Sequence, residues 1–597
     1  MKAKISTLRR SDGYALLLVL IFTSIGAFIL AATMTRTANV SKLNERSRIH
    51  TVNLSAAEAA TEKIAAKMLQ DFRMGGYAGL ASKLDGYRTT LPTASESSFW
   101  TNFTFSDGTG GNSKMYVQCV SNWTYVPLES QYYGLWGYAA KYRILSNVRN
   151  NDGLEAVTAA VQQDVQLALI PIFQFAIFYN SPLEFTWAAP FTVRGRVHAN
   201  ADIITGSAWP LSFSSVVTTT GGIYKKSWAG YNSSSMTGSI NYNGGTSTNV
   251  PTLSLPVGTN NSAAAVREIV NFPPGSESMA TPMGTNRYFN KAELAVLVSN
   301  QTITISFRKQ GGFDATPTIQ TWWTTNAGYV TNIPNFISIS NTFRDQRENK
   351  TIKVTQLDVG KFKTWAANYY TVTNKLGLSG AGAVPNILYI GDFRTNSSTT
   401  LSGIRLTNGA ALPARGLSVA TPNPLYVLGN YNCPDAADLN TTDTSATAPA
   451  SLVSDALTVL SSTWRDSLSS GSFTSRVAAN TTVNAAMISG IVFSDSSDGS
   501  PFSGGVMNFP RLLEDWGNGA STKLTLNTSM VNLFNSVYAT NYWQNPGTYY
   551  YAPIRDFNFD NNFTNMAKIP PGTPCLSAII RNSWANPPPG KVDYAGY

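Results

Sequence analysis

Histidine and serine chemistry has few candidates in this chain. The sequence holds two histidines, His50 and His198, and they form no HxxxH or HExxH pair of the kind that binds zinc. A Ser–His–Asp triad would have to use one of them. The nearest approach to a nucleophile elbow, at residues 377–381, lacks the final glycine of G-x-S-x-G. A P-loop and a GxGxxG motif are also missing, so the sequence does not predict a nucleotide cofactor.

One acidic stretch has the spacing of a calcium loop. Asp556, Asn558 and Asp560 occupy its first, third and fifth positions, but the sixth and twelfth are Asn561 and Ala567 instead of Gly and Glu. The phenylalanines that alternate with these residues are more typical of a half-buried strand. A second acidic stretch, 495–499, has the composition of a solvated turn and only occasionally marks a metal loop. We therefore predict no bound metal.

Paired carboxylates would be the signature of a polysaccharide-active enzyme, which needs two of them a few ångströms apart. Glu514 and Asp515 are adjacent in sequence, so they point to opposite faces of a strand or about 100° apart on a helix. They cannot form such a pair by themselves. We therefore predict no catalytic residues and no enzymatic activity, and keep a tethered polysaccharide-active enzyme as an alternative.

The three cysteines, Cys119, Cys433 and Cys575, are widely spaced, which excludes a zinc motif and a CxxC redox pair. In an oxidising compartment one disulfide, Cys433–Cys575, could form. Three isolated thiols fit the sequence equally well.

The overall composition favours an extracytoplasmic β-rich protein. Charged residues make up 13% of the chain, against roughly 25% in a typical soluble domain. Ser, Thr, Asn, Gly and Tyr replace them, a mix suited to strands and turns. The net charge of +10 is not concentrated in a basic block, so the sequence does not favour nucleic-acid binding.

The N-terminal residues predict a membrane anchor. Residues 14–34 contain no charged side chain and are long enough to cross a bilayer as a helix. Basic residues precede this span, so the positive-inside rule places the N-terminus in the cytoplasm, although further basic residues from Arg36 onward weaken the rule. A cleaved signal peptide would end there. Here an i+4 stripe continues the helix to the pair Gly75–Gly76; the stripe comprises Val52, Ala56, Ala60, Ile64 and Met68.

These elements define the predicted organisation. Residues 1–13 are a cytoplasmic leader, 14–34 a transmembrane helix and 35–75 its extracytoplasmic continuation. Residues 76–169 form a small α/β head, 170–432 a β-rich domain, and 433–597 a mixed, mainly β region in which 452–464 have helical spacing. The fold class is α+β. Short strands broken by Gly and Asn favour a β-solenoid for the large region over the alternative, a β-sandwich.

The N-terminus resembles a known family of filament subunits. The leader ending in Gly13, the aromatic Tyr14, the apolar run and the Ser-Ala-Ala-Glu-Ala-Ala stretch at 55–60 are similar to class III prepilins. The closest resemblance is to the PilX-type minor pilins of type IV pilus assembly and to the K-type minor pseudopilin of type II secretion. It implies that a prepilin peptidase cuts after Gly13 and that Tyr14 becomes the methylated N-terminus.

One departure from the family pattern bears on the subunit's role. Leu18 stands where most major pilins carry a glutamate that faces the neighbouring subunit's amine. The resemblance therefore implies a minor subunit that initiates a filament or lies at its tip. The stretch Val-Arg-Gly-Arg-Val-His-Ala-Asn at 193–200 also resembles the large C-terminal regions attached to PilX-like N-termini.

The function expected from these observations is structural. We expect a minor pilin or pseudopilin in the bacterial inner membrane, crossing it once, with most of the chain periplasmic or on the cell surface. Its partners would be other pilin subunits, packed on the Val52–Met68 stripe through close helix contacts, the prepilin peptidase, the membrane, and a surface or polysaccharide ligand of the large region. The other alternative is a membrane-tethered surface adhesin without a filament.

Overall fold

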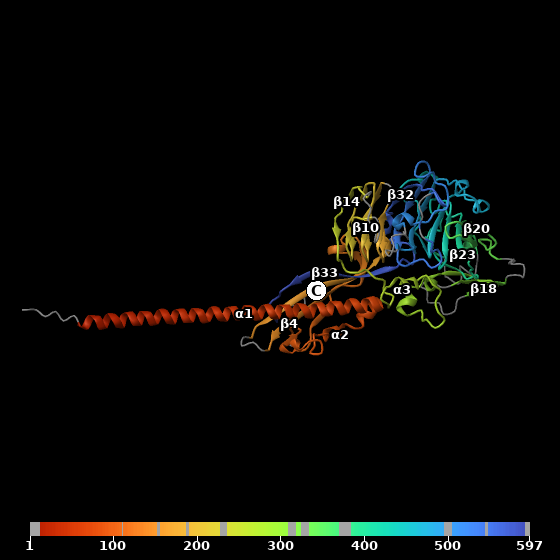
Figure 1. The fold of residues 1–597 in the computed structure, drawn as a ribbon. Helices are drawn as coiled ribbons and strands as arrows, with labels where there is room; N and C mark the ends of the chain where they lie inside the picture. The colour runs from red at the N-terminus through yellow and green to blue at the C-terminus, as the bar shows by residue number, and fades with distance from the viewer. Residues whose placement is uncertain are drawn as a thin grey trace, which may run out of the picture.

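One long helix dominates the N-terminal part of the computed structural model, which describes residues 12–109, 111–151, 156–186, 190–226, 236–307, 318–323, 333–368, 384–494, 504–541, 543 and 547–590. This helix, α1 (Asp12–Ala81), is about 105 Å long at 1.5 Å per residue. Its first half projects well beyond the rest of the molecule (Figure 1). The predicted long apolar helix is confirmed. At Gly76, where φ is +60°, the backbone kinks and then resumes, because glycine tolerates positive φ.

The second half of α1 packs on a six-stranded antiparallel sheet, here called the head sheet. Its central strand, β4 (Trp136–Asn150), pairs along one edge with three short strands in succession and along the other edge with β5 (Thr158–Pro171). The short strands are β1 (Phe103–Ser106), β2 (Tyr116–Cys119) and β3 (Thr124–Pro127). A short helix, α2 (Leu84–Arg88), follows α1. We call the second half of α1, α2 and this sheet together the head.

The last strand of the head sheet comes from the far end of the chain. β33 (Cys575–Ala585) pairs antiparallel with β5, from Cys575 opposite Pro171 to Ala585 opposite Gln162. In Figure 1 it is the dark blue strand that lies against the orange strands of the head. The β-rich region between β5 and β33 is therefore an insertion into the head. The predicted boundaries, with a head of 76–169 and a separate region of 433–597, do not reflect this pairing.

A twelve-stranded sheet, the long sheet, forms one wall of the inserted region. Its strands pair in parallel except at the end where β17 and β18 form antiparallel pairs. In spatial order they are β15 (Thr246–Ser247), β12 (Val217–Thr219), β9 (Val197–Ala199), β6 (Ile177–Tyr179), β31 (Met530–Asn532), β29 (Ala486–Ser489), β26 (Ala450–Ser454), β24 (Leu417–Ala420), β22 (Ile387–Asp392), β16 (Leu294–Val298), β17 (Thr302–Phe307) and β18 (Thr318–Trp323).

Smaller sheets form the remaining walls. Three of them have three strands each, and the fourth is larger. The first three are β13 (Ile223–Tyr224), β10 (Ile203–Gly206) and β7 (Leu183–Thr186); β14 (Ile240–Tyr242), β11 (Leu211–Phe213) and β8 (Phe191–Val193); and β28 (Thr481–Asn484), β30 (Lys523–Asn527) and β32 (Ile554–Asn558). The fourth contains β19 (Ile337–Ser338), β20 (Thr342–Asp345), β21 (Lys350–Asp358), β23 (Thr400–Thr407), β25 (Pro424–Leu428) and β27 (Ala456–Leu460). The helices here are α3 (Ala263–Arg267), α4 (Pro282–Asn286), α5 (Tyr288–Lys291) and α6 (Val359–Asn368).

The chain enters and leaves the inserted region in the middle of the long sheet. β6, the first strand of the insertion, pairs with β9 on one side and with β31, near its end, on the other. Strands β9, β12 and β15 then follow outward in chain order, while β22, β24, β26, β29 and β31 approach β6 from the opposite side. The two ends of the insertion therefore meet beside the head, which explains how β5 and β33 can be neighbours.

Buried side chains repeat in register along the stacked strands. Val197 lies opposite both Ile177 and Val217, and all three are buried. Asparagines repeat at one turn as well: the Asn484 amide donates to the Asn432 carbonyl at 3.0 Å, and the Asn527 amide donates to Asn484 Oδ1 at 2.8 Å. Such bonds satisfy buried backbone and amide groups at successive turns.

Both faces of the long sheet are buried along its central strands. Along β6, β31, β29, β26, β24, β22 and β16, side chains of one face enter a core inside the inserted region and those of the other face a second core between this sheet and the head sheet. Leu452 belongs to the first core and Val453 to the second. For this reason the helical spacing read at 452–464 is wrong: these residues form β26, β27 and the turn after them, because a strand buried on both faces loses its polar alternation.

Candidate functional site

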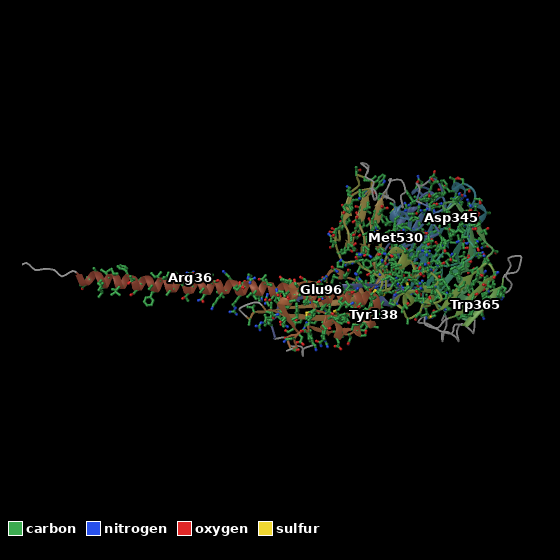
Figure 2. All side chains as sticks on the ribbon, turned by 60° about the horizontal axis from the view of Figure 1, so that its bottom comes forward. Arg36, Glu96, Tyr138, Asp345, Trp365 and Met530 are labelled. Carbon is green, nitrogen blue, oxygen red and sulfur yellow. The ribbon has the colours of Figure 1, made fainter. Side chains whose placement is uncertain are left out.

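The exposed part of α1 is the most unusual surface of the molecule. Residues 14–44 are exposed without interruption, including Tyr14 at 78% and Phe28 at 77%. Residues 14–34 contain no charged side chain, and none of them is buried. Figure 2 shows these side chains, up to Arg36, standing clear of every other element. The helix is long and apolar enough to cross a membrane once.

The hydroxyl groups within this apolar segment are internally satisfied. Thr23 Oγ1 donates to the Val19 carbonyl at 2.8 Å, and Ser24 Oγ donates to the Leu20 carbonyl at 2.6 Å. Because each hydroxyl bonds to the carbonyl four residues earlier, it can enter a hydrocarbon layer without an unmet donor.

The predicted cleavage site lies in the first turn of α1. The helix begins at Asp12, so the peptide bond between Gly13 and Tyr14 is inside it, and residues 1–11 of the predicted leader lie outside the described part. Leu18, at the position of the usual pilin glutamate, is exposed. The structure does not test cleavage after Gly13, which stays a prediction.

The predicted helix-packing stripe contacts the chain's own head sheet. Ala56, Ala60, Ile64 and Met68 are at most 2% exposed and share a core with buried residues of β4 and β5, while Val52 packs at its margin. The role predicted for this stripe is corrected: its small residues permit close approach to a sheet, and the stripe is already covered. The apolar side chains of α1 that remain exposed to a neighbouring helix lie mainly in residues 14–44.

The two histidines have unrelated surroundings. His50 is exposed on α1, whereas His198 is buried in β9. His198 Nδ1 hydrogen-bonds Thr218 Oγ1 at 2.8 Å, and Nε2 hydrogen-bonds Asn200 Oδ1 at 3.0 Å. Burial lowers the pKa of His198 to about 4, so the ring is neutral at physiological pH. The contacts of His198 suit a structural role. Residues 377–381, the nearest approach to a nucleophile elbow, lie outside the described residues.

The carboxylates of the calcium-like stretch are already engaged. Asp556 pairs with Lys523 at 2.7 Å and accepts from the Asn558 amide at 2.9 Å. Asp560 accepts from Thr444 Oγ1 at 2.9 Å and from the Asn562 backbone N–H at 3.0 Å. Within the described residues, no group of three or more His, Cys, Asp or Glu side chains is placed to hold a metal ion. Residues 495–499 lie outside this part of the chain.

Glu514 and Asp515 diverge, as their adjacency requires. The Glu514 carboxylate is fully buried and accepts from the Ser461 backbone N–H and hydroxyl, both at 2.6 Å. Asp515 instead accepts from the Gly517 backbone N–H at 2.9 Å. Glu514 therefore joins neighbouring turns of the chain and does not face an open cleft together with Asp515.

Glu514 should make stability depend on pH. Burial raises its pKa to about 7, above the value of 4.5 for an exposed glutamate. Between these values the folded chain holds a proton that the unfolded chain has released, so the free energy of unfolding decreases as pH rises through this window, by about 3 kcal/mol at most. We expect Glu514→Gln to flatten this decrease and to stabilise the chain at about pH 8. Urea unfolding at about pH 5 and pH 8 measures both effects.

The exposed Glu129→Gln variant is the matched control for this prediction, because Glu129 pairs with Lys141 at the surface. It should retain the pH dependence of the unaltered chain. An equal pH dependence in the Glu514→Gln variant would show that Glu514 is not the responsible group.

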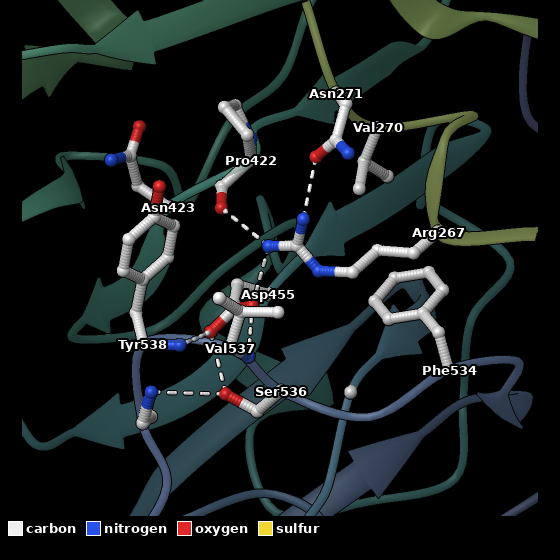
Figure 3. A network of polar contacts seen from close by, with 12 residues as sticks. Arg267, Val270, Asn271, Pro422, Asn423, Asp455, Phe534, Ser536, Val537 and Tyr538 are labelled. Carbon is white, nitrogen blue, oxygen red and sulfur yellow. Dashed lines mark hydrogen bonds and ion pairs between the residues drawn. The ribbon is translucent and has the colours of Figure 1, made fainter. Parts of the chain in front are cut away.

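A buried ion pair connects α3 to the inserted strands (Figure 3). Arg267 Nη2 donates to Asp455 Oδ1 at 2.7 Å, and Arg267 Nη1 donates to Asn271 Oδ1 at 2.6 Å. Asp455 is fully buried and also accepts from Ser536 Oγ at 2.5 Å and from the backbone N–H groups of Val537 and Tyr538 at 2.8 and 3.1 Å. Each oxygen of the Asp455 carboxylate accepts two hydrogen bonds from protein donors, so this cluster is structural.

The cysteines are free thiols, so the Cys433–Cys575 bridge weighed from the sequence is not present. Cys433 is buried in the turn after β25, near the Asp435 carbonyl, whereas Cys575 begins β33 in the head sheet. Burial raises the pKa of both thiols, that of Cys575 to about 11. Both are therefore protonated and weakly nucleophilic at neutral pH.

Two hollows lie where the head meets the inserted region. One has a volume of about 530 Å³ and is bordered by Gly76 at the kink of α1 and by Leu169 of β5. The other, of about 340 Å³, is bordered by Tyr125 of β3 and Tyr138 of β4. Both share Lys291, Thr573 and Cys575. Sequence reasoning missed Lys291, since its only local signal is a position at the end of a four-residue helix.

No family model, no curated protein and no solved structure matches this chain.

Proposed function

We propose that this chain is a minor pilin-like structural subunit that is anchored by the apolar half of α1 and carries the inserted β-rich region outside the cytoplasm. One observation carries the proposal: a single helix is exposed over residues 14–44, apolar over residues 14–34, and packs on an antiparallel sheet over its second half. A subunit built in this way can leave the bilayer and enter a filament without refolding, because the same helix face can contact lipid or neighbouring helices.

The proposal extends to the inserted region, which we take to be a β-solenoid. Parallel pairing of successive strands, in-register apolar residues and the bonded asparagines Asn432, Asn484 and Asn527 favour it over a sandwich. Because the solenoid starts and ends beside the head, it would be held sideways at the end of α1. This position suits display at a filament tip.

The proposed location is the bacterial inner membrane, crossed once, with the N-terminus in the cytoplasm and the head outside. The proposed partners are other pilin or pseudopilin subunits and a prepilin peptidase. The contact surface for neighbouring helices would lie in residues 14–44, since the Val52–Met68 stripe is covered by the head sheet.

The mature N-terminus tests this proposal directly. Mass spectrometry of the chain purified from its native membrane should find Tyr14 as the first residue, with an added methyl group. A variant with Gly13→Val should keep the leader, because the resemblance places the cut after glycine. An intact Met1 in the unaltered chain would contradict the filament role and leave a simple anchor. A cut beyond Met34 would contradict the anchor as well.

A further inference from the structure

The two junction hollows lie where four separate parts of the chain converge. These parts are the kink of α1, the head strands β3 to β5, the segment that holds α4 and α5, and the turn before β33. Lys291, Thr573 and Cys575 line both hollows, so the two spaces adjoin the same three side chains. Their volumes, about 530 and 340 Å³, are each in the range of small-molecule sites.

Lys291 is the one charged side chain among the described residues that line these hollows. It is partly buried and has no carboxylate within ion-pair distance in the described part of the chain. Its ammonium group lies 3.4 Å from the Gly572 carbonyl and 5.4 Å from the centre of the Tyr288 ring. A partly desolvated ammonium with such weak partners can gain strongly from an anion.

The Tyr125 side chain forms part of the wall of the smaller hollow. The Tyr125 hydroxyl is buried and makes no hydrogen bond. The Tyr125 ring stacks on Trp136 at 5.8 Å and meets the edge of Tyr138 at 5.2 Å, so the position of its hydroxyl is fixed. Apart from these groups the walls are mostly apolar, with Leu169, Pro171, Ile569 and Met566 among them.

We propose that the junction hollows form a binding site for an organic carboxylate with an apolar body, in which Lys291 pairs with the carboxylate. The shortage of further free donors disfavours a sugar acid, whose hydroxyl groups would lose their water partners on entry. The site joins the head to the inserted region, so its occupant would contact both. The inference does not depend on filament assembly.

The charge on Lys291 gives the site a pH signature. Burial lowers the pKa of Lys291 to about 8. The titratable groups around it are Cys575, Tyr125, Tyr138 and Tyr288; burial raises the pKa of Cys575 to about 11, that of Tyr125 to about 12, and that of Tyr288 well above its usual value. Lys291 is therefore the group that loses its charge as pH rises through 8, and carboxylate binding should weaken over the same range.

Calorimetric titration of the full chain in detergent tests the site with three probes. We expect saturable binding of 3-phenylpropanoate, and binding at least about tenfold weaker for the neutral 3-phenylpropanamide and for D-glucuronate. The affinity for 3-phenylpropanoate should drop about tenfold or more in Lys291→Gln and remain within a few-fold in Lys291→Arg. Lys361→Gln is the matched control, since Lys361 lines a separate hollow. This variant should leave the affinity for 3-phenylpropanoate unchanged.

Each binding result either supports or overturns the proposed carboxylate site. Loss of binding in Lys291→Gln with retention in Lys291→Arg supports the site, because the second variant keeps the positive charge that pairs with the carboxylate and the first does not. The proposal is overturned if 3-phenylpropanoate shows no saturable binding up to about 10 mM, or if Lys291→Gln binds it as well as the unaltered chain. Tighter binding of D-glucuronate would overturn the apolar character of the ligand.

Discussion

A chain ended after Pro574 should lose its folded head, although it retains α1 and every other strand of the head sheet. The truncation removes β33, which pairs with β5 over ten residues. Leu576, Ile579 and Ile580 of this strand are buried between the head sheet and its neighbours. Burial of three such side chains contributes about 5–8 kcal/mol, which is comparable to the whole stability of an ordinary domain.

The truncation also removes polar interactions that stabilise the head. Arg581 pairs with Glu62 of α1 at 2.5 Å, and this pair lowers the pKa of the Glu62 carboxyl. Without β33, the outer edge of β5 presents unpaired backbone groups over its length, which favours aggregation. The remaining helix and strands would then enclose a core that lacks the side chains of β33.

Hydrogen exchange of the backbone amides in β5 measures the result. In the full chain these amides should be protected, and in the truncated chain they should exchange freely. A chain ended after Ala585 is the matched control, because it keeps β33 and should keep the protection. Protected β5 amides in the chain ended after Pro574 would contradict the view that the head is completed by its C-terminal strand.

The sequence predicts the head's elements but not their partner at the far end. Residues 155–169 alternate only loosely and are compatible with a strand or a helix. Even a clear alternation would not say which strand lies beside β5. β33 begins about 400 residues after β5 ends, so no local signal connects them. The long apolar helix is the opposite case: its signal is the length of an uncharged run, which is local and is confirmed.

The same limit explains the errors in the candidate residues. The stripe from Val52 to Met68 correctly identifies an apolar helix face, but periodicity cannot tell whether a sheet of the same chain or another helix covers it. Residues 452–464 look helical because β26 is buried on both faces. Lys291 has almost no local signal, since the hollows that it lines are bordered by segments that are distant in the sequence.

Asp455 shows how a polar residue can be essential to a fold without any sequence motif. Its principal partner, Arg267, lies 188 residues earlier, and its other donors come from the segment around Ser536 (Figure 3). The carboxylate therefore joins three segments that are remote in sequence. Buried charges are rarely tolerated unless they are paired in this way.

We expect Asp455→Ala to destabilise the chain by about 3–5 kcal/mol. The substitution leaves the Arg267 guanidinium, whose side chain is 11% exposed, without its carboxylate. It also leaves the hydroxyl of Ser536 and the backbone N–H groups of Val537 and Tyr538 without this acceptor. The midpoint of urea unfolding, followed by circular dichroism of the β-rich region, measures the loss.

A double variant separates the cost of an orphaned charge from the value of the pair itself. Asp455→Leu combined with Arg267→Met removes both charges and keeps apolar volume, so it should recover part of the stability that Asp455→Ala loses, as buried ion pairs replaced by apolar residues often do. The recovery should be incomplete, because the backbone N–H groups of Val537 and Tyr538 still lose their acceptor. A loss below about 1 kcal/mol in Asp455→Ala would contradict this account, since it is the cost expected of a solvent-exposed pair.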